Sequence, residues 1–204
     1  MRAKTKPVII PTKERIYMNH ATFYGMDSVK RHIARYKWAA SHLFQTDIVL
    51  DAGCGSGYGT KLLSNACARA VGVDISTEAI DYAKYKSDEK SNTLEYRRED
   101  LSDLPINELF DAVVCIEVIE HLDKESQLKF MKSITHVLAI GGRFIVTTPV
   151  KKSEPMTEYH KHEFSRDEFK DFLGRHFCSV HFDDPLKFGV PVDFMLAVCN
   201  GVIR

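Results

Sequence analysis

The sequence predicts an α/β fold in which helices cover both faces of a doubly wound, mostly parallel sheet of seven strands. Three observations support this prediction. Strand-like and helix-like segments alternate along most of the chain, the first buried strand-like run ends in glycines, and the last two strand-like runs follow one another as in a hairpin. Such alternation gives a parallel sheet with helices on both faces, and the hairpin makes the last strand antiparallel. At 204 residues the chain suits one domain with a full core.

The first expected element is a helix over residues 27–44, because apolar side chains recur there at steps of three and four residues. It precedes the first strand and is expected to form an N-terminal helical cap. Later helix ends are marked by capping side chains and by glycines. The later helices are expected at residues 59–68, at 76–86 capped by Ser76 or Thr77, at 124–142 stopped by Gly141 and Gly142, and at 165–177 capped by Ser165. The strands are expected at residues 47–53, 69–74, 93–100, 110–118, 143–149, 178–184 and 192–200.

Charge and composition exclude several classes of protein. Lys+Arg and Asp+Glu each number 28, so net charge gives no general argument for nucleic-acid binding. Basic side chains nevertheless gather near the start, which predicts a flexible basic arm over residues 1–26 before a single domain over residues 27–204. That arm is either a solvated terminus or a means of attracting an anionic substrate. The five cysteines show no C-x-x-C spacing and no apolar stretch reaches 15 residues, so a reduced, cytoplasmic protein without a membrane segment is expected.

A glycine loop follows the first expected strand. Asp51 opens it, and Gly53, Gly55 and Gly57 let the backbone approach a ligand at the carboxyl edge of the sheet. The spacing departs from the dinucleotide pattern G-x-G-x-x-G, because the third glycine comes one residue early and Tyr58 takes its place. An acidic residue at the start of the loop would repel a pyrophosphate and suits a cationic ligand.

Two further acidic residues end the next two expected strands. Asp74 ends the second strand, where a carboxylate can accept hydrogen bonds from ribose hydroxyls, and Asp100 ends the third, where it can hold an exocyclic amine. Either residue alone could be an ordinary turn residue. Together with the glycine loop they predict a nucleoside-containing ligand at this edge of the sheet.

These segments, in this order, resemble the Rossmann-like class I methyltransferases that use S-adenosylmethionine (SAM), over about residues 30–200. "VLDAGCGSGYG" is similar to the family's first motif, "VGVDIS" to the second, "EDLSDLP" to the third and "FDAVVCIEVIEHL" to the fourth. The resemblance implies SAM as cofactor and direct methyl transfer. It also implies cofactor contacts from the residues that match the motifs. These are Asp51, Gly53, Gly55, Gly57, Asp74, Ile75, Asp100, Leu101, Ile116 and Glu117.

The stretch "EVIEH" after the fourth strand, together with the distant "EYHKHEF", supplies Glu120, His121 and His160 as candidate catalytic groups. Three interpretations stay open. Glu120 is a carboxylate at a helix start, or His121 is a general base for the acceptor, or Glu117, Glu120, His121 and His160 together bind a divalent metal ion. The last arrangement resembles small-RNA 3′-end 2′-O-methyltransferases. The same segments equally resemble bacterial sugar or quinone O-methyltransferases.

The sequence therefore predicts methyl transfer to a hydroxyl or amine of a small metabolite such as a sugar. Residues 1–45 and 150–165 are expected to recognise the acceptor, because no insertion domain is present. Metal-dependent 2′-O-methylation of RNA is an alternative. A SAM-binding regulatory protein without turnover is an alternative of another class. Oligomeric state is not predicted.

Overall fold

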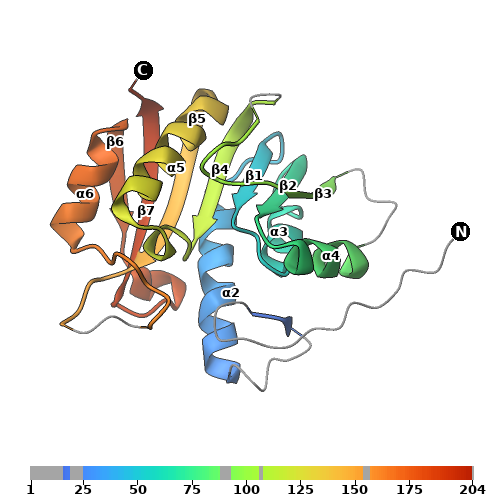
Figure 1. The fold of residues 1–204 in the computed structure, drawn as a ribbon, viewed down its shortest axis with the longest axis horizontal. Helices are drawn as coiled ribbons and strands as arrows, with labels where there is room; N and C mark the ends of the chain where they lie inside the picture. Colours follow the sequence, from blue (N-terminus) through green and yellow to red (C-terminus); the bar gives the residue numbers. More distant parts are fainter. Residues whose placement is uncertain (1–15, 19–24, 88–92, 106–107, 154–156, 204) are drawn as a thin grey trace, which may run out of the picture.

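The computed structural model describes residues 16–18, 25–87, 93–105, 108–153 and 157–203. Its centre is a seven-stranded sheet in the order β3-β2-β1-β4-β5-β7-β6, in which β7 runs antiparallel to both of its neighbours and the other paired strands are parallel (Figure 1). The predicted fold is confirmed. The strands are β1 (Ile48–Ala52), β2 (Arg69–Asp74), β3 (Leu94–Arg98), β4 (Phe110–Ile116), β5 (Leu138–Pro149), β6 (Phe177–Asp183) and β7 (Phe194–Val202).

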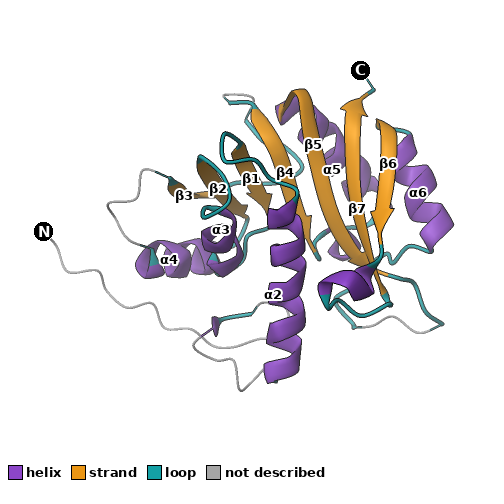
Figure 2. Ribbon diagram, turned by 180° about the vertical axis from the view of Figure 1, so that it is seen from behind, coloured by secondary structure: helices purple, strands orange, loops and turns teal. Residues whose placement is uncertain are grey.

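Helices cover both faces of the sheet (Figure 2). One core layer joins the sheet to α2 and α3 through Trp38 and Leu63, and the opposite layer joins it to α5 and α6 through Phe130 and Phe169. Among the described residues, none of the helices has the length and apolar character needed to cross a membrane. The helices are α2 (Met26–Ser41), α3 (Tyr58–Leu63), α4 (Thr77–Lys86), α5 (Lys124–Val137) and α6 (Arg166–Gly174), with short 3-10 turns η2 (Ile119–His121) and η3 (Pro185–Phe188).

The predicted end of the helix before β5 is wrong. α5 ends at Val137, and Leu138 already pairs with Phe110 of β4. The register between the two strands shifts just after this pair, and Gly141 takes a left-handed φ of 78° that accommodates the irregularity. Leu138 is fully buried, so pairing with β4 overrides the local helical pattern. The first helix after the glycine loop is also shorter than predicted, because it ends at Leu63.

Local capping signals are confirmed. The Ser76 hydroxyl accepts a hydrogen bond from the Ala79 amide at the start of α4 (3.2 Å). Ser165 and Glu168 form a reciprocal capping box at the start of α6. Of the predicted basic arm, residues 1–15 and 19–24 lie outside the described part, so its flexibility stays a prediction. Tyr17 is described; it is buried, with its ring edge-on to Tyr82 of α4 (4.9 Å between centroids).

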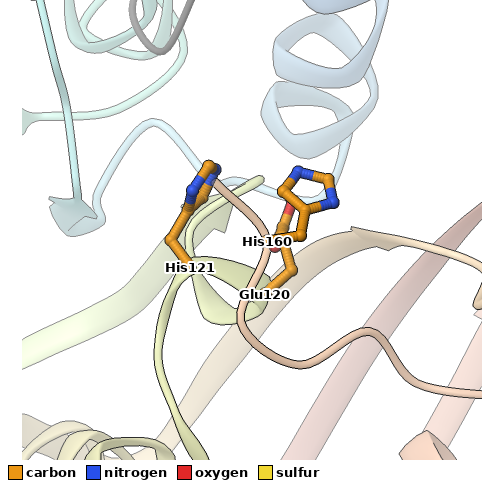
Figure 3. A group of neighbouring side chains, drawn as sticks. All are labelled: Glu120, His121 and His160. Atoms are coloured by element: carbon orange, nitrogen blue, oxygen red, sulfur yellow. The ribbon is translucent and has the colours of Figure 1, made fainter. Parts of the chain in front are cut away.

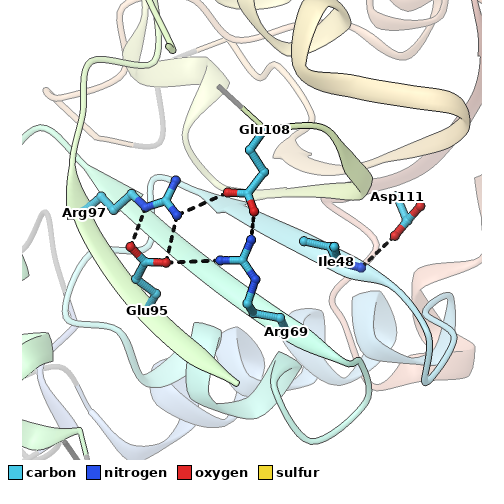
Figure 4. A network of polar contacts seen from close by, with 6 residues as sticks. All are labelled: Ile48, Arg69, Glu95, Arg97, Glu108 and Asp111. Atoms are coloured by element: carbon cyan, nitrogen blue, oxygen red, sulfur yellow. Dashed lines mark hydrogen bonds and ion pairs between the residues drawn. The ribbon is translucent and has the colours of Figure 1, made fainter. Parts of the chain in front are cut away.

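An ionic network joins β2, β3 and the segment just before β4 (Figure 4). Glu95 of β3 accepts from Arg97 (2.7 Å) and from Arg69 of β2 (3.1 Å), and Glu108 pairs with both arginines. Partly exposed pairs of this kind contribute little individually, but here four side chains share one network. They fix the edge strand β3, whose far end leads to Asp100.

Candidate active site

A cavity lies at the carboxyl ends of β1 to β4. Here the strand order reverses: after β1 the chain continues to β2 on one side of the sheet, and after β4 it continues to β5 on the other. Its walls come from the glycine loop, the ends of β2, β3 and β4, and helix α2. Nine of the predicted site residues line it: Gly53, Gly55, Asp74, Ile75, Asp100, Leu101, Ile116, Glu117 and His121. Other lining residues not predicted from the sequence include Ile16, His32, Tyr36, Cys54 and Ser56.

The glycine loop has specific conformational needs. Gly53 has φ 83°, and a Cβ atom there would lie 2.4 Å from a methyl carbon of Val118. Gly55 has φ 52°, open space where a side chain would point, and an amide that donates to the Asp74 carboxylate (3.0 Å). The other oxygen of Asp74 accepts from the Ser76 amide (2.9 Å), so the loop and the N-terminus of α4 fix this carboxylate in the cavity wall.

Asp51 does not line the cavity. It is fully buried below the loop, where it accepts hydrogen bonds from the Thr60 hydroxyl (2.6 Å) and the Tyr36 hydroxyl (3.3 Å). Burial raises the pKa of Asp51 to about 7, although the two hydroxyl donors oppose the rise. Tyr36 does line the cavity, so its phenol connects the buried Asp51 to the cavity wall.

Gly57 also lies outside the main cavity. It has φ 79° and precedes α3, and a Cβ atom there would lie 2.6 Å from both Ala83 and the ring of Tyr96. The Tyr96 hydroxyl donates to its carbonyl (2.6 Å). These contacts explain the glycine by close packing of the loop against α4 and β3.

The adjacent residues Glu120 and His121 come together with His160, which is distant in the sequence (Figure 3). One potential ligand atom from each lies within 4.8 Å of the others. The two imidazole rings are edge-on, with 4.9 Å between centroids. Glu120 is fully buried on η2, where one carboxylate oxygen accepts from the Thr148 hydroxyl (3.2 Å) and the other has no hydrogen-bond partner among the described residues. Burial and the nearby Glu117 raise the pKa of Glu120.

The backbone of η2 holds the distant loop in place. The amides of Lys161 and His162 both donate to the Glu120 carbonyl (2.9 and 3.1 Å). His160 Nδ1 contacts the buried Glu163 carboxylate (2.5 Å), which orients the His160 ring. His121 Nδ1 lies 3.2 Å from the Tyr159 carbonyl, and because a carbonyl only accepts, Nδ1 carries the proton and Nε2 the lone pair.

Glu117 lies near this group and has a charged partner that was not predicted from the sequence. Its carboxylate forms an ion pair with Arg35 of α2, which is buried. His32, on the same face of α2, hydrogen-bonds through Nδ1 to the Tyr58 hydroxyl. The helical repeat that placed Tyr36 on the buried face also places His32 there, so that periodicity was the available signal.

Comparison with known proteins identifies the domain. Residues 50–146 match the family model described as "Methyltransferase domain". A probable S-adenosylmethionine-dependent methyltransferase of Mycolicibacterium smegmatis is 30% identical over 151 residues, which cover 71% of this chain and 56% of that protein. A ubiquinone biosynthesis O-methyltransferase of Actinobacillus pleuropneumoniae is 35% identical over 106 residues, 49% of this chain and 44% of that one. The chain thus spans about half the length of the curated relatives it matches.

Solved structures share the fold at lower identity. The DhpI–SAH complex aligns with a TM-score of 0.71 and 20% identity, covering 91% of each chain. The small RNA methyltransferase HEN1 aligns with a TM-score of 0.68 and 20% identity, covering 82% of this chain and 25% of that one. At this identity the two structures support the fold alone.

Proposed function

Because the chain belongs to the class I SAM-dependent methyltransferases, we propose that it transfers the methyl group of SAM to a hydroxyl or amine of a small metabolite such as a sugar. The observation that carries the proposal is the position of His121. It lines the cavity together with Glu117 and also contacts the loop that holds His160. A proton acceptor therefore lies where the donor cavity meets the expected acceptor loop.

The cavity fits SAM, the cofactor of the family. Open space at Gly55 lets the ligand approach the backbone, and the carboxylates of Asp74 and Asp100 can accept from ribose and adenine groups. Ile75 is 56% exposed and offers an apolar surface to a base. When bound, SAM supplies a methyl group on a positively charged sulfur, a strong electrophile. The protein has to bind this donor, exclude water and align the acceptor.

His121 is proposed to deprotonate the acceptor. With Nδ1 donating to the Tyr159 carbonyl, Nε2 is the basic atom. A neutral imidazole can take a proton from a hydroxyl as the new bond to carbon forms, an effect of roughly 10²–10⁴-fold. His160, oriented by Glu163, forms the neighbouring wall.

The first experiment is transfer of labelled methyl from SAM into cell extract divided into metabolite, RNA and protein fractions, with and without a chelator. Label in the metabolite fraction that is insensitive to chelator supports the proposal. His121→Gln should then reduce transfer by at least about 100-fold with SAH binding retained. His136→Gln, at an exposed position on α5, is the matched control and should change neither. Binding of SAM with no label in any fraction would favour a regulatory protein without turnover.

A second candidate is metal-assisted 2′-O-methylation of RNA, favoured by the convergence of Glu120, His121 and His160. One carboxylate and two imidazoles suit Mn²⁺ or Zn²⁺, and the unpartnered Glu120 oxygen is available to an ion. Glu117 is a weaker candidate ligand because Arg35 already pairs with it. Chelator-sensitive label in RNA, with both label and bound metal lost in Glu120→Gln, would replace the first proposal with this one. A Glu120→Gln protein with unchanged metal content would exclude it.

A further inference from the structure

We propose that Arg35 is a positioning residue, which holds the Glu117 carboxylate ionised and facing the positively charged sulfur of the methyl donor. The inference rests on the proposed function, because it requires SAM in the cavity that Glu117 lines. It assigns a role to a buried charge on α2 that neither the glycine loop nor the Glu120–His121–His160 group uses.

Arg35 is held on several sides. Only 5% of its side chain is accessible, compared with 21% for Glu117. The charged groups of the two residues touch, and the guanidinium carbon lies 4.3 Å from the ring centroid of Phe194. These two contacts join α2, the end of β4 and the start of β7. A guanidinium packed in this way cannot turn into solvent.

Glu117 itself has an unusual backbone. Its φ of 54° is the one left-handed value at a non-glycine position in the described part of the chain. The amide still donates to the Thr147 carbonyl (3.2 Å), so the turn is an ordered continuation of β4. Strained residues of this kind persist where their surroundings hold them, and they cluster at functional sites. The strain directs the Glu117 side chain into the cavity wall, where Arg35 contacts it.

Burial would otherwise neutralise this carboxylate. Glu120 lies close by and is fully buried, so two carboxyl groups share one poorly solvated region. Burial raises the pKa of Glu117, and the adjacent Arg35 charge is the main influence opposing that rise. Removing Arg35 would therefore raise the pKa of Glu117 further and favour loss of its negative charge.

The charge of Glu117 matters because donor and product differ in charge. SAM carries a positive sulfur, and SAH, left after transfer, has a neutral one. A carboxylate held in the cavity wall therefore favours SAM over SAH. Loss of the negative charge removes that preference. The charge is lost when Glu117 itself is replaced, or when Glu117 becomes protonated after Arg35 is replaced.

The test is titration calorimetry with SAM and with SAH on the full chain. Glu117→Gln and Arg35→Gln should each weaken SAM binding about tenfold while changing SAH binding by less than about threefold, as expected for loss of one nearby opposite charge. The double variant should be no weaker than Glu117→Gln alone, because both changes act through one group. Arg35→Lys keeps the positive charge and should lose less of the SAM preference than Arg35→Gln. Arg31→Gln, at an exposed position one turn earlier on α2, is the control and should behave as wild type.

Equal weakening of SAM and SAH in Arg35→Gln, or additive losses in the double variant, would show that Arg35 only packs α2 and would overturn the inference. If Arg35→Gln does not fold, Glu117→Gln decides: an unchanged ratio of SAM to SAH affinity overturns the inference. Wild-type protein that binds neither molecule would refute the proposed function instead, so the two failures are distinguishable.

Discussion

Replacing Asp51 by asparagine is expected to make the protein more stable above neutral pH while weakening its hold on the methyl donor. Asp51 is fully buried, and its hydrogen-bond partners are the hydroxyls of Thr60 and Tyr36. Both hydroxyls can accept as well as donate, so an asparagine amide can keep a hydrogen bond to each of them. The substitution removes a buried negative charge at almost constant volume.

The expected magnitude follows from the pKa. A rise from 3.8 in the unfolded chain to about 7 in the folded protein penalises the charged form by about 4 kcal/mol. Because the folded pKa of this acid is raised, the penalty is absent below pH 3.8, grows as the pH increases and is complete above about pH 7. The gain in Asp51→Asn should therefore be about 1.7 kcal/mol at pH 5 and reach up to about 4 kcal/mol at pH 8.5.

The assay is urea unfolding of wild type and Asp51→Asn between pH 5 and pH 8.5, with the difference in free energy of unfolding plotted against pH. Taking the difference cancels other titrating groups, including Glu120. Asp81→Asn, at an exposed position on α4, is the matched control and should give a flat difference near zero. A flat difference for Asp51→Asn as well would refute the argument that this carboxylate is charged and buried at neutral pH. SAM titration of the same protein tests whether the charge, acting past Tyr36, contributes to donor binding.

Two further substitutions test the packing and capping. Gly59→Ala places a Cβ 2.1 Å from the ring of the buried Tyr36, so it should destabilise the protein by about 1–3 kcal/mol in thermal unfolding. Gly174→Ala is the control, because the space around Gly174 is open, and it should not destabilise the protein. Equal effects of the two substitutions would contradict the packing argument. Ser165→Ala removes the capping box with Glu168 and should cost about 1 kcal/mol in urea unfolding, and a loss below about 0.3 kcal/mol would mean that the cap is not formed in solution.

Much of the fold could be predicted because its signals are local. Ser76 and Ser165 mark helix starts by hydrogen bonds within one turn, and the apolar repeat of residues 27–44 identifies the buried face of α2. The boundary at Val137 was missed for the opposite reason. The segment Leu138–Ala139–Ile140 is apolar and compatible with helix or strand, and the choice is made by pairing with Phe110 of β4.

The cavity wall was predictable because the ends of neighbouring parallel strands must meet. Asp74, Ile75, Asp100 and Leu101 line one cavity for that reason. Asp51 was expected there on the same argument, but whether a side chain faces the ligand or the core depends on its partners. Thr60 and Tyr36, from two different helices, bind it from below, and no pattern within the loop encodes that arrangement.

Arg35 shows where counting charges fails. Within residues 1–37 it is one of nine basic side chains, and by sequence alone it is equivalent to Arg31 one turn earlier. In the fold Arg31 is exposed, whereas Arg35 is 4% exposed and paired. The difference arises because α2 crosses the end of β4 where Glu117 leaves the strand with a left-handed φ. A buried arginine without such a partner would be strongly destabilising. The strained turn at Glu117 and the charge of Arg35 on α2 are therefore expected to depend on each other. The effect of a substitution at one of these residues should change when the other is also replaced.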